Sequence, residues 1–280
     1  MSEAEAMGSR RPIAVGRTAE IYPWGEGRVM KLYRPGSSRA YVSREAQVSR
    51  VARQLGLPAP AVYDSQAEDG VWEIDGRLGI LFDRIDGSPM LRDLVARPWR
   101  TARHAATLGR LHARIHTACG DGLPDLRAKI ERAIETASGL PESLRASARD
   151  ALTRLPRGAC VCHGDFHPDN VLLASRGSMI VDWGPASCGP PPADVAWTYL
   201  LFTVAGAPVG ASTATKLLLL ALRRLALRIY LRTYFKRTGL AWRDVEQWLG
   251  VISILRLGDG IPEERDALLA LVRRHLGEPA

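Results

Sequence analysis

The sequence predicts an α+β protein with a small, strand-rich region at residues 1–85 and a larger, mainly helical region at residues 86–280. Short apolar runs separated by glycine fill the first third of the chain, whereas the rest repeats its apolar residues with a helical period. Strand-like runs return briefly between residues 159 and 181. With 280 residues, of which 46% are hydrophobic, the chain can fill a substantial core.

In the first region, glycine-rich turns separate the expected strands, and Asp75-Gly76 is a strong hairpin signal. We expect strands at residues 13–15, 20–24, 28–33, 61–63, 71–74 and 78–82. One helix is predicted at residues 39–55, where Val48, Ala52 and Leu55 share a face and Gly56 ends the pattern.

In the second region, amphipathic periods predict helices at residues 99–117, 126–138, 142–155, 195–204, 214–237, 242–257 and 262–276. Between them lie expected strands at residues 159–162, 171–173 and 179–181.

The charge and the cysteine content of the chain argue against several classes of protein. The net charge of +8 comes from 38 basic and 30 acidic side chains, and nearly all the basic ones are arginines spread along the chain. Because these arginines are spread over the whole chain, they indicate a general bias in composition and not a basic surface that binds nucleic acid. We therefore expect no nucleic-acid partner. Four cysteines do not form a disulfide framework, and residues 1–11 hold no apolar run typical of a signal peptide. We expect a cytoplasmic monomer or homodimer that does not bind membranes.

The most informative segment is His163-Gly-Asp-Phe-His-Pro-Asp-Asn170, followed by Ile180-Val-Asp-Trp-Gly184. If residues 171–173 and 179–181 pair around a loop at 174–178, residue 173 faces 179, and Asn170 faces Asp182 with their Cβ atoms about 5 Å apart. An amide oxygen and a carboxylate are hard ligands that suit Mg²⁺. Asp165, just before the hairpin, could accept a proton from a hydroxyl, which fits phosphoryl transfer.

Such a site needs a cation for the phosphates, and Lys31 lies mid-strand in Val29-Met-Lys-Leu-Tyr33. A half-buried ammonium is costly unless it is paired. Glu45 lies on the apolar face of the following helix and needs a partner as well. We therefore expect Lys31 and Glu45 to form an ion pair that orients the lysine toward phosphates.

In this order and spacing, these residues resemble the aminoglycoside phosphotransferase family, relatives of choline kinases and protein kinases, from about residue 13 to residue 276. The resemblance implies a bilobal protein-kinase-like fold, with a nucleotide-binding lobe at residues 1–85 and a catalytic and acceptor-binding lobe at 86–280. It implies that Asp165 is the catalytic base, that Asn170 and Asp182 bind Mg²⁺, and that Lys31 and Glu45 orient phosphates.

The resemblance extends to less specific segments. The turn of Gly16, Arg17 and Thr18 lies where the family covers the phosphates, and Phe82, Arg84 and Ile85 resemble the hinge that receives adenine. Asp194, together with His163, is similar to a structural brace of the catalytic loop, although Asp194 could also simply cap a helix.

The implied activity is transfer of the γ-phosphate of ATP, with Mg²⁺, to a hydroxyl of a small molecule. An antibiotic acceptor of the aminoglycoside or basic peptide type is the first expectation, and a metabolite such as choline, an amino alcohol or a sugar is the alternative. A silent nucleotide-binding module is a second alternative.

Two charged segments could contribute to acceptor binding. Asp259, Glu263 and Glu264 could bind a cationic substrate, although acids at the start of a helix also stabilise it. Basic residues repeat along the predicted helix at 214–237, which indicates either a solvated face or a docking surface for an anion, a second subunit or an acidic substrate.

Two groups of residues resemble metal ligands. His112 and His116 are one helical turn apart, with His104 eight residues before His112, but the segment lacks a third ligand or the adjacent glutamate of a metalloprotease helix. We expect a packed helix face. The residues Cys160, Cys162, His163, His167 and Cys188 suggest a soft-metal cluster, but Cys-x-Cys is not the usual structural-zinc spacing.

Overall fold

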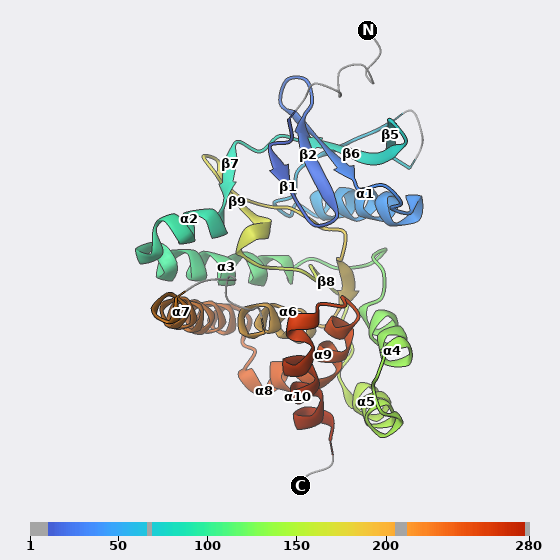
Figure 1. Cartoon of the computed structure of the whole chain (residues 1–280), viewed down its shortest axis with the longest axis vertical. Coiled ribbons are helices and arrows are strands. Elements are labelled where there is room, and N and C mark those ends of the chain that lie inside the picture. Colours follow the sequence, from blue (N-terminus) through green and yellow to red (C-terminus); the bar gives the residue numbers. More distant parts are fainter. Residues whose placement is uncertain (1–10, 66–68, 205–211, 278–280) are drawn as a thin grey trace. The chain divides into compact units, whose positions relative to one another are not determined.

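The computed structural model describes residues 11–65, 69–204 and 212–277, which form two compact units. The N-terminal unit takes in the described residues of Met1–Met90 and Asp169–Pro185, and the C-terminal unit those of Leu91–Pro168 and Ala186–Ala280. The first is rich in strands and the second in helices, which confirms the predicted α+β class (Figure 1). The domain boundary between residues 85 and 86 stays a prediction, and residues 1–10, where we expect no signal peptide, lie outside the described range.

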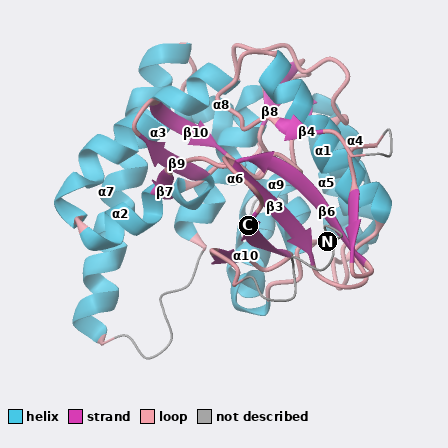
Figure 2. Ribbon diagram, turned by 90° about the horizontal axis from the view of Figure 1, so that it is seen from above, coloured by secondary structure: helices cyan, strands magenta, loops and turns pink. Residues whose placement is uncertain are grey.

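A six-stranded antiparallel sheet forms the N-terminal unit, in the order β1-β2-β3-β6-β4, with β5 also paired to β6. The long strands β3 and β6 run side by side (Figure 2). The strands are β1 (Ala14–Val15), β2 (Ala19–Pro23), β3 (Arg28–Tyr33), β4 (Val62–Tyr63), β5 (Trp72–Ile74) and β6 (Arg77–Asp83).

The helix of this unit, α1 (Arg39–Gln54), begins and ends on recognisable signals. The Ser38 side chain accepts a hydrogen bond from the Tyr41 amide, which satisfies one of the free amides of the first turn. At the other end Gly56 adopts a φ of 73°, a left-handed conformation in which glycine carries no steric penalty. The predicted helix is therefore present, one residue shorter than expected.

Alternation along β3 decides which side chains meet α1. Met30 and Leu32 are buried in a cluster with Trp24 on one face of the sheet. Val29 and Tyr33, which point to the opposite face, belong to a second cluster that includes residues of α1. Because successive side chains of a strand point to opposite faces, Lys31 shares the face of Tyr33 and is directed toward the helix.

A second, smaller sheet of the N-terminal unit has the order β10-β9-β7. Its strands are β7 (Gly87–Pro89), β9 (Val171–Ala174) and β10 (Gly177–Ile180). The predicted hairpin is therefore present, and the segment Gly87–Pro89 adds a third strand that we did not predict. Its sequence of glycine, serine and proline has none of the alternation that identifies a strand.

The register that we predicted for this hairpin was wrong by one residue. We expected residue 173 to face 179, but Leu173 pairs with Ser178. Ala174 pairs with Gly177, so residues 175–176 alone connect the strands in place of the longer loop. Gly177 has a φ of 120°, which a tight connection can use because glycine lacks a Cβ atom. A short turn of this kind fixes the register of the strands that it joins.

The C-terminal unit consists mainly of helices, with one small two-stranded sheet. Its helices are α2 (Met90–Ala96), α3 (Thr101–Ile115), α4 (Leu126–Thr136), α5 (Glu142–Arg154), α6 (Pro191–Thr203), α7 (Thr213–Thr238), α8 (Trp242–Glu246), α9 (Leu249–Leu257) and α10 (Arg265–Leu276). Short 3₁₀ helices lie at Pro98–Arg100 and Pro262–Glu264, and strands β8 (Cys160–Cys162) and β11 (Ser187–Gly189) pair with each other.

Two helical predictions in this unit need correction. The segment 242–257, predicted as one helix, is two, because the Trp248 amide bonds to the Val245 carbonyl over 3.0 Å in a tight turn. This turn buries the large Trp248 side chain, which is 1% exposed. Helix α2 was not predicted at all.

Helix α3 packs against the C-terminal half of α7 (Figure 1). Gly109 of α3 permits their close approach, since a Cβ atom at this position would lie 2.7 Å from the carbonyl oxygen of Tyr230. On α7, Arg224, Arg228, Arg232 and Lys236 are all exposed, in agreement with a solvated face. Among the described residues, no helix is both long enough and apolar enough to cross a bilayer.

Candidate active site

Lys31 is the centre of an ion-pair network in the N-terminal unit. Its Nζ atom lies 2.5 Å from Oε1 of Glu45 and 3.0 Å from Oδ1 of Asp182. The network therefore joins strand β3, helix α1 and Asp182, which is the second residue after the end of strand β10. Burial alone would lower the pKa of Lys31, but the two carboxylates raise it above its ordinary value, so the ammonium stays charged.

Glu45 is fixed on both of its oxygens. Its second oxygen, Oε2, accepts a hydrogen bond from the Tyr33 hydroxyl over 2.5 Å, and the residue is 1% exposed. Gly184 packs directly against this carboxylate, since a Cβ atom at residue 184 would lie 2.9 Å from Oε2. The chain can pass Glu45 this closely because residue 184 has no side chain.

Asp182 has an unusual backbone conformation, with a φ of 63°. A non-glycine residue in this left-handed region is uncommon, and such residues are found most often in turns and functional sites. The following Trp183 is buried, and its indole nitrogen donates a hydrogen bond to the Ile180 carbonyl over 2.9 Å, which anchors the turn. The Asp182 side chain is 39% exposed and thus remains accessible to a ligand.

Asn170 ends a 3₁₀ turn at Pro168–Asn170, immediately before β9. The Val181 amide donates a hydrogen bond to the Asn170 carbonyl over 3.0 Å, so Asn170 lies opposite Val181 and not opposite Asp182 as predicted. Both Asn170 and Asp182 still belong to the open end of the same hairpin. Lys31 contacts Oδ1 of Asp182, and among the described residues no hydrogen bond or ion pair involves the other carboxylate oxygen, Oδ2. This carboxylate oxygen and the Asn170 amide are hard donors that fit Mg²⁺.

The predicted phosphate-covering turn connects β1 and β2. Gly16, Arg17 and Thr18 are exposed, and Arg34 stabilises the turn by donating hydrogen bonds to the carbonyls of Gly16 and Arg17 over 3.1 and 2.9 Å. The turn lies in the same unit as Lys31. Its role toward a nucleotide stays a prediction.

The predicted hinge follows strand β6. Phe82 is buried in the cluster beneath α1, and the Arg84 amide donates a hydrogen bond to the Gly27 carbonyl over 2.9 Å. The Ile85 carbonyl accepts a hydrogen bond from the Gly87 amide. The Arg84 amide thus already has a partner, whereas the Ile85 carbonyl keeps a second lone pair that can accept a further hydrogen bond. The role of this segment toward adenine stays a prediction.

Asp165 lies in the C-terminal unit, on the loop after β8. Its carboxylate is 3.4 Å from Nε2 of His167, and its amide donates a hydrogen bond to Nδ1 of His163 over 3.2 Å. Burial alone would raise the pKa of Asp165, but the hydrogen bond from His167 and the charges of His167, His163 and Arg256 lower it below its ordinary value. Asp165 is therefore ionised at neutral pH and can accept a hydrogen bond from a hydroxyl.

Asp194, in the first turn of α6, binds the backbone of the same loop. Its Oδ2 accepts the His163 amide over 2.6 Å and its Oδ1 accepts the Gly164 amide over 2.8 Å. Burial alone would raise its pKa, but His112 and His116 hold it well below the usual range. The residue thus does more than cap its own helix.

The acidic segment near the C-terminus is already paired. Arg256 of α9 donates hydrogen bonds to both carboxylate oxygens of Glu264, over 2.8 and 2.9 Å, and to Asp259 over 2.7 Å. Glu264 is buried, whereas Glu263 is exposed. Two of the three acids that we predicted to bind an acceptor therefore have their charge balanced by an arginine.

The sequence missed several partners of these residues. Tyr33 beside Glu45 and Arg256 beside Glu264 join residues only 12 and 8 positions apart, but on different elements. His112 and His116 lie 82 and 78 positions before Asp194, so this contact joins segments far apart in the chain. From the His-x-x-x-His spacing we expected a packed helix face with no third ligand, and the sequence did not identify the Asp194 carboxylate that lies beside both histidines.

The fold resembles solved structures of phosphotransferases at low sequence identity. A thermostable mutant of the aminoglycoside phosphotransferase APH(4)-Ia, in complex with ADP and hygromycin B, superposes with a TM-score of 0.65 at 15% identity, over 98% of this chain and 95% of that chain. A macrolide 2'-phosphotransferase from Brachybacterium faecium gives a TM-score of 0.56 at 16% identity, over 98% and 93%. A choline/ethanolamine kinase family protein from Mesorhizobium loti gives 0.54 at 17% identity, over 96% and 86%.

These likenesses confirm the predicted kinase-like fold. No curated protein sequence matches the chain. The sequence model of the phosphotransferase enzyme family, in contrast, matches residues 10–227, which is well over half of the chain. The chain therefore belongs to the phosphotransferase enzyme family.

Proposed function

We propose that the protein transfers the γ-phosphate of ATP to a hydroxyl group of a small molecule. The observation that carries this proposal is the ammonium of Lys31, which is held by Glu45 at 2.5 Å and by Asp182 at 3.0 Å. A buried lysine that two carboxylates keep charged is suited to bind phosphate oxygens, and the partly exposed Asp182 is suited to bind a metal beside them.

The N-terminal unit would bind the nucleotide. The phosphates would take the place of Asp182 as one partner of Lys31, while Glu45, held by Tyr33, would keep the lysine in position. Structures of the same fold in complex with ADP, AMP-PNP and GDP support a nucleotide as substrate. The turn at Gly16 and the hinge at Phe82, Arg84 and Ile85 complete the residues that we propose for this role.

Asn170 and Asp182 would hold Mg²⁺. The ion, when bound, neutralises the charge of the phosphate oxygens during transfer. The protein's own contribution is to place two hard oxygen donors at the end of one hairpin, and to keep Asp182 oriented by the turn at Trp183.

Asp165 would orient the acceptor hydroxyl and take its proton. Its lowered pKa makes it a weak base, which suits a loose transition state in which the proton leaves late. The brace from Asp194 to the His163 and Gly164 amides would hold the loop that carries it.

A hydroxylated antibiotic is the acceptor that we propose first, since aminoglycoside and macrolide phosphotransferases are among the structural neighbours. A metabolite such as choline, an amino alcohol or a sugar is second, on the likeness to the choline/ethanolamine kinase family protein. The pairing of Arg256 with Glu264 and Asp259 leaves Glu263 as the remaining acid of that segment for a cationic acceptor.

Label transfer from γ-labelled ATP tests the proposal. Purified protein with Mg²⁺ would be incubated with aminoglycosides, macrolides, basic peptides, choline, amino alcohols and sugars, and each product would be checked for one added phosphoryl group. We expect one class to be labelled, with no labelling when EDTA is present.

The same experiment separates the enzyme from a silent nucleotide-binding module. A protein that binds ATP with Mg²⁺, yet neither hydrolyses it slowly nor labels any acceptor, would contradict the proposed activity.

A further inference from the structure

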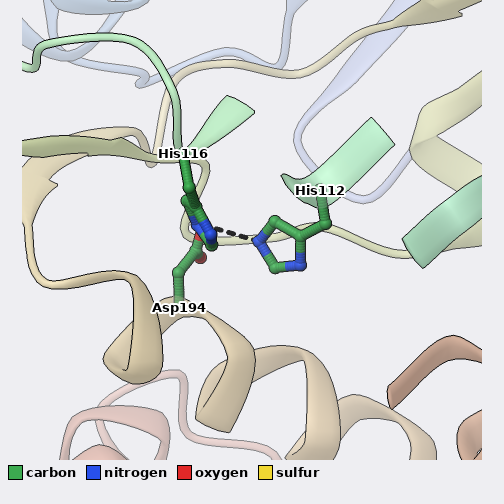
Figure 3. Close-up of side chains that lie close together, drawn as sticks. All are labelled: His112, His116 and Asp194. Atoms are coloured by element: carbon green, nitrogen blue, oxygen red, sulfur yellow. Dashed lines mark hydrogen bonds and ion pairs between the residues drawn. The ribbon is translucent and has the colours of Figure 1, made fainter. Parts of the chain in front are cut away.

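His112 of α3 and His116, the residue directly after α3, converge on one oxygen of Asp194 (Figure 3). The Nε2 atom of His112 lies 3.0 Å from Oδ2 of Asp194, and that of His116 lies 3.2 Å from the same oxygen. All three side chains are buried. Two histidines and a carboxylate this close could be a metal site or a hydrogen-bond network, and their other contacts decide between the two.

The outer nitrogens of both rings face hydroxyl groups of α7. Nδ1 of His112 lies 2.6 Å from the Tyr230 hydroxyl, and Nδ1 of His116 lies 2.6 Å from the Tyr234 hydroxyl. One assignment satisfies every group: each tyrosine donates to Nδ1, and each Nε2–H donates to Asp194. Burial, with a contribution from His116, lowers the pKa of His112 to about 4, so His112 is a neutral donor at pH 7.

In this assignment neither Nε2 atom keeps a lone pair for a metal. Both Nε2 atoms carry hydrogens, and Oδ2 of Asp194 accepts the His163 amide over 2.6 Å in addition to the two rings. The ring of Phe166, with its centroid 4.5 Å from that of His112, packs against the cluster as well. The geometry is that of a buried carboxylate whose charge is spread over four N–H donors.

The cluster is connected to the loop that carries Asp165. Asp194 accepts the amides of His163 and Gly164, and Gly164 adopts a φ of 74° immediately before Asp165. The loop therefore depends on the orientation of the Asp194 carboxylate, and the two histidines fix this orientation.

We propose that His116, together with His112, is a positioning residue for phosphoryl transfer: by donating to Asp194 it holds the backbone of His163 and Gly164 and thereby places Asp165. The proposal rests on the proposed function, in which Asp165 acts on the acceptor. It connects α7, through Tyr234 and His116, to the catalytic loop.

Variants of His116 distinguish a role in positioning the catalytic loop from a role in the stability of the fold alone. His116→Met fills a similar volume without a donor, His116→Gln keeps an N–H near the place of Nε2, and His116→Asn keeps one nearer Nδ1. His104→Met is the matched control, since His104 is buried on α3 and lies 2.7 Å from the carboxylate of Asp93. Within the part of the chain that the structure describes, Asp93 forms side-chain hydrogen bonds with Arg97, Arg100 and His104 and with no residue of the catalytic loop.

The readouts are kcat, the KM for ATP, and amide hydrogen exchange at residues 163 and 164. We expect His116→Met to lower kcat about 10- to 100-fold with the KM for ATP unchanged, because a small displacement of a catalytic group is costly. Exchange at these amides should become about tenfold faster. His116→Gln should restore both quantities, His116→Asn should not, and His104→Met should leave both unchanged.

Three results would overturn the proposal: equal kcat and exchange rates in His116→Met and His104→Met, failure of His116→Gln to restore the loop, or one zinc ion per chain in metal analysis of the purified protein. If the wild-type protein labels no acceptor, the proposed function fails on its own, and the exchange measurement still decides whether His116 holds the loop.

Discussion

At the scale of single residues, the candidate site depends on one buried cation between two carboxylates. Lys31 has 12% of its side chain exposed and Glu45 has 1%, so their pair is shielded from solvent. Removing one partner of such a pair leaves an uncompensated buried charge, which is far more costly than replacing both partners by apolar side chains.

This difference allows the contribution of Lys31 to the stability of the protein to be separated from its contribution to ATP binding and catalysis. Lys31→Met should destabilise the protein by about 3–5 kcal/mol, and the double variant Lys31→Met/Glu45→Leu should recover most of that loss. Both should lose about 10²–10³-fold in kcat/KM for ATP, because neither keeps a cation for the phosphates. Chemical denaturation and steady-state kinetics measure the two quantities. A double variant with wild-type kinetics would show that the pair is purely structural.

Gly184 offers a second test at this scale. In Gly184→Ala the added Cβ atom would lie 2.9 Å from Oε2 of Glu45, whose other contacts are to Lys31 and Tyr33. The carboxylate must shift, so we expect the KM for ATP to rise about tenfold with a lower melting temperature. Kinetics at varied ATP concentration check this. An unchanged KM for ATP would mean that the position of Glu45 does not control Lys31.

The sequence predicted the meeting of Lys31 with Glu45 because each residue interrupts an otherwise apolar pattern and needs a partner. It could not predict that Asp182 joins them, since the register of the hairpin depends on a turn two residues long. The partners of Asp194 come from another helix, and no local pattern encodes such a contact.

At the scale of elements, Asp93 connects three consecutive helical segments. Its carboxylate, 7% exposed, bonds to His104 of α3 over 2.7 Å and also pairs with Arg97 and with Arg100 of the intervening 3₁₀ helix. The hydrogen bond from His104 first, and those from the two arginines next, outweigh burial and lower the pKa of Asp93 to about 2. Asp93 thus holds α2 against the start of α3.

The pH dependence of this contribution follows from the sign of the shift. The folded-state pKa of about 2 lies below the ordinary 3.8, so the stabilisation is present above pH 4 and is lost as the pH falls from about 4 toward 2. Asp93→Asn should be less stable than the wild-type protein at pH 7, and this difference in stability should narrow between about pH 4 and pH 2. Urea denaturation measures the difference. Glu26→Gln, at an exposed turn, is the control, and a difference that is constant with pH would contradict the assignment.

Most helices and strands could be predicted because their apolar periods and glycine turns are local features. Helix α1 and strand β3 lie where the pattern places them. The exceptions are α2, β7, β11 and the break between α8 and α9. They are held by contacts with other segments, which override weak local preferences.

At the scale of the whole molecule, the structure shows where some of the residues behind the net charge of +8 lie. Part of the positive charge lies on the exposed basic residues of α7. The charge of Arg256, in contrast, is balanced by its ion pairs with Glu264 and Asp259. The acidic segment could be predicted from the sequence, but its pairing with Arg256 of the preceding helix α9 could not.

The central claim is that this member of the phosphotransferase family transfers phosphate with Asp165 as the base. The most direct test compares kcat for the labelled acceptor in the wild-type protein, Asp165→Asn and Asp169→Asn, where Asp169 is an exposed acid four residues further along the chain. We predict that Asp165→Asn lowers kcat about 10²–10⁴-fold while ATP affinity is retained, and that Asp169→Asn behaves as the wild type. Wild-type kcat in Asp165→Asn would contradict the account.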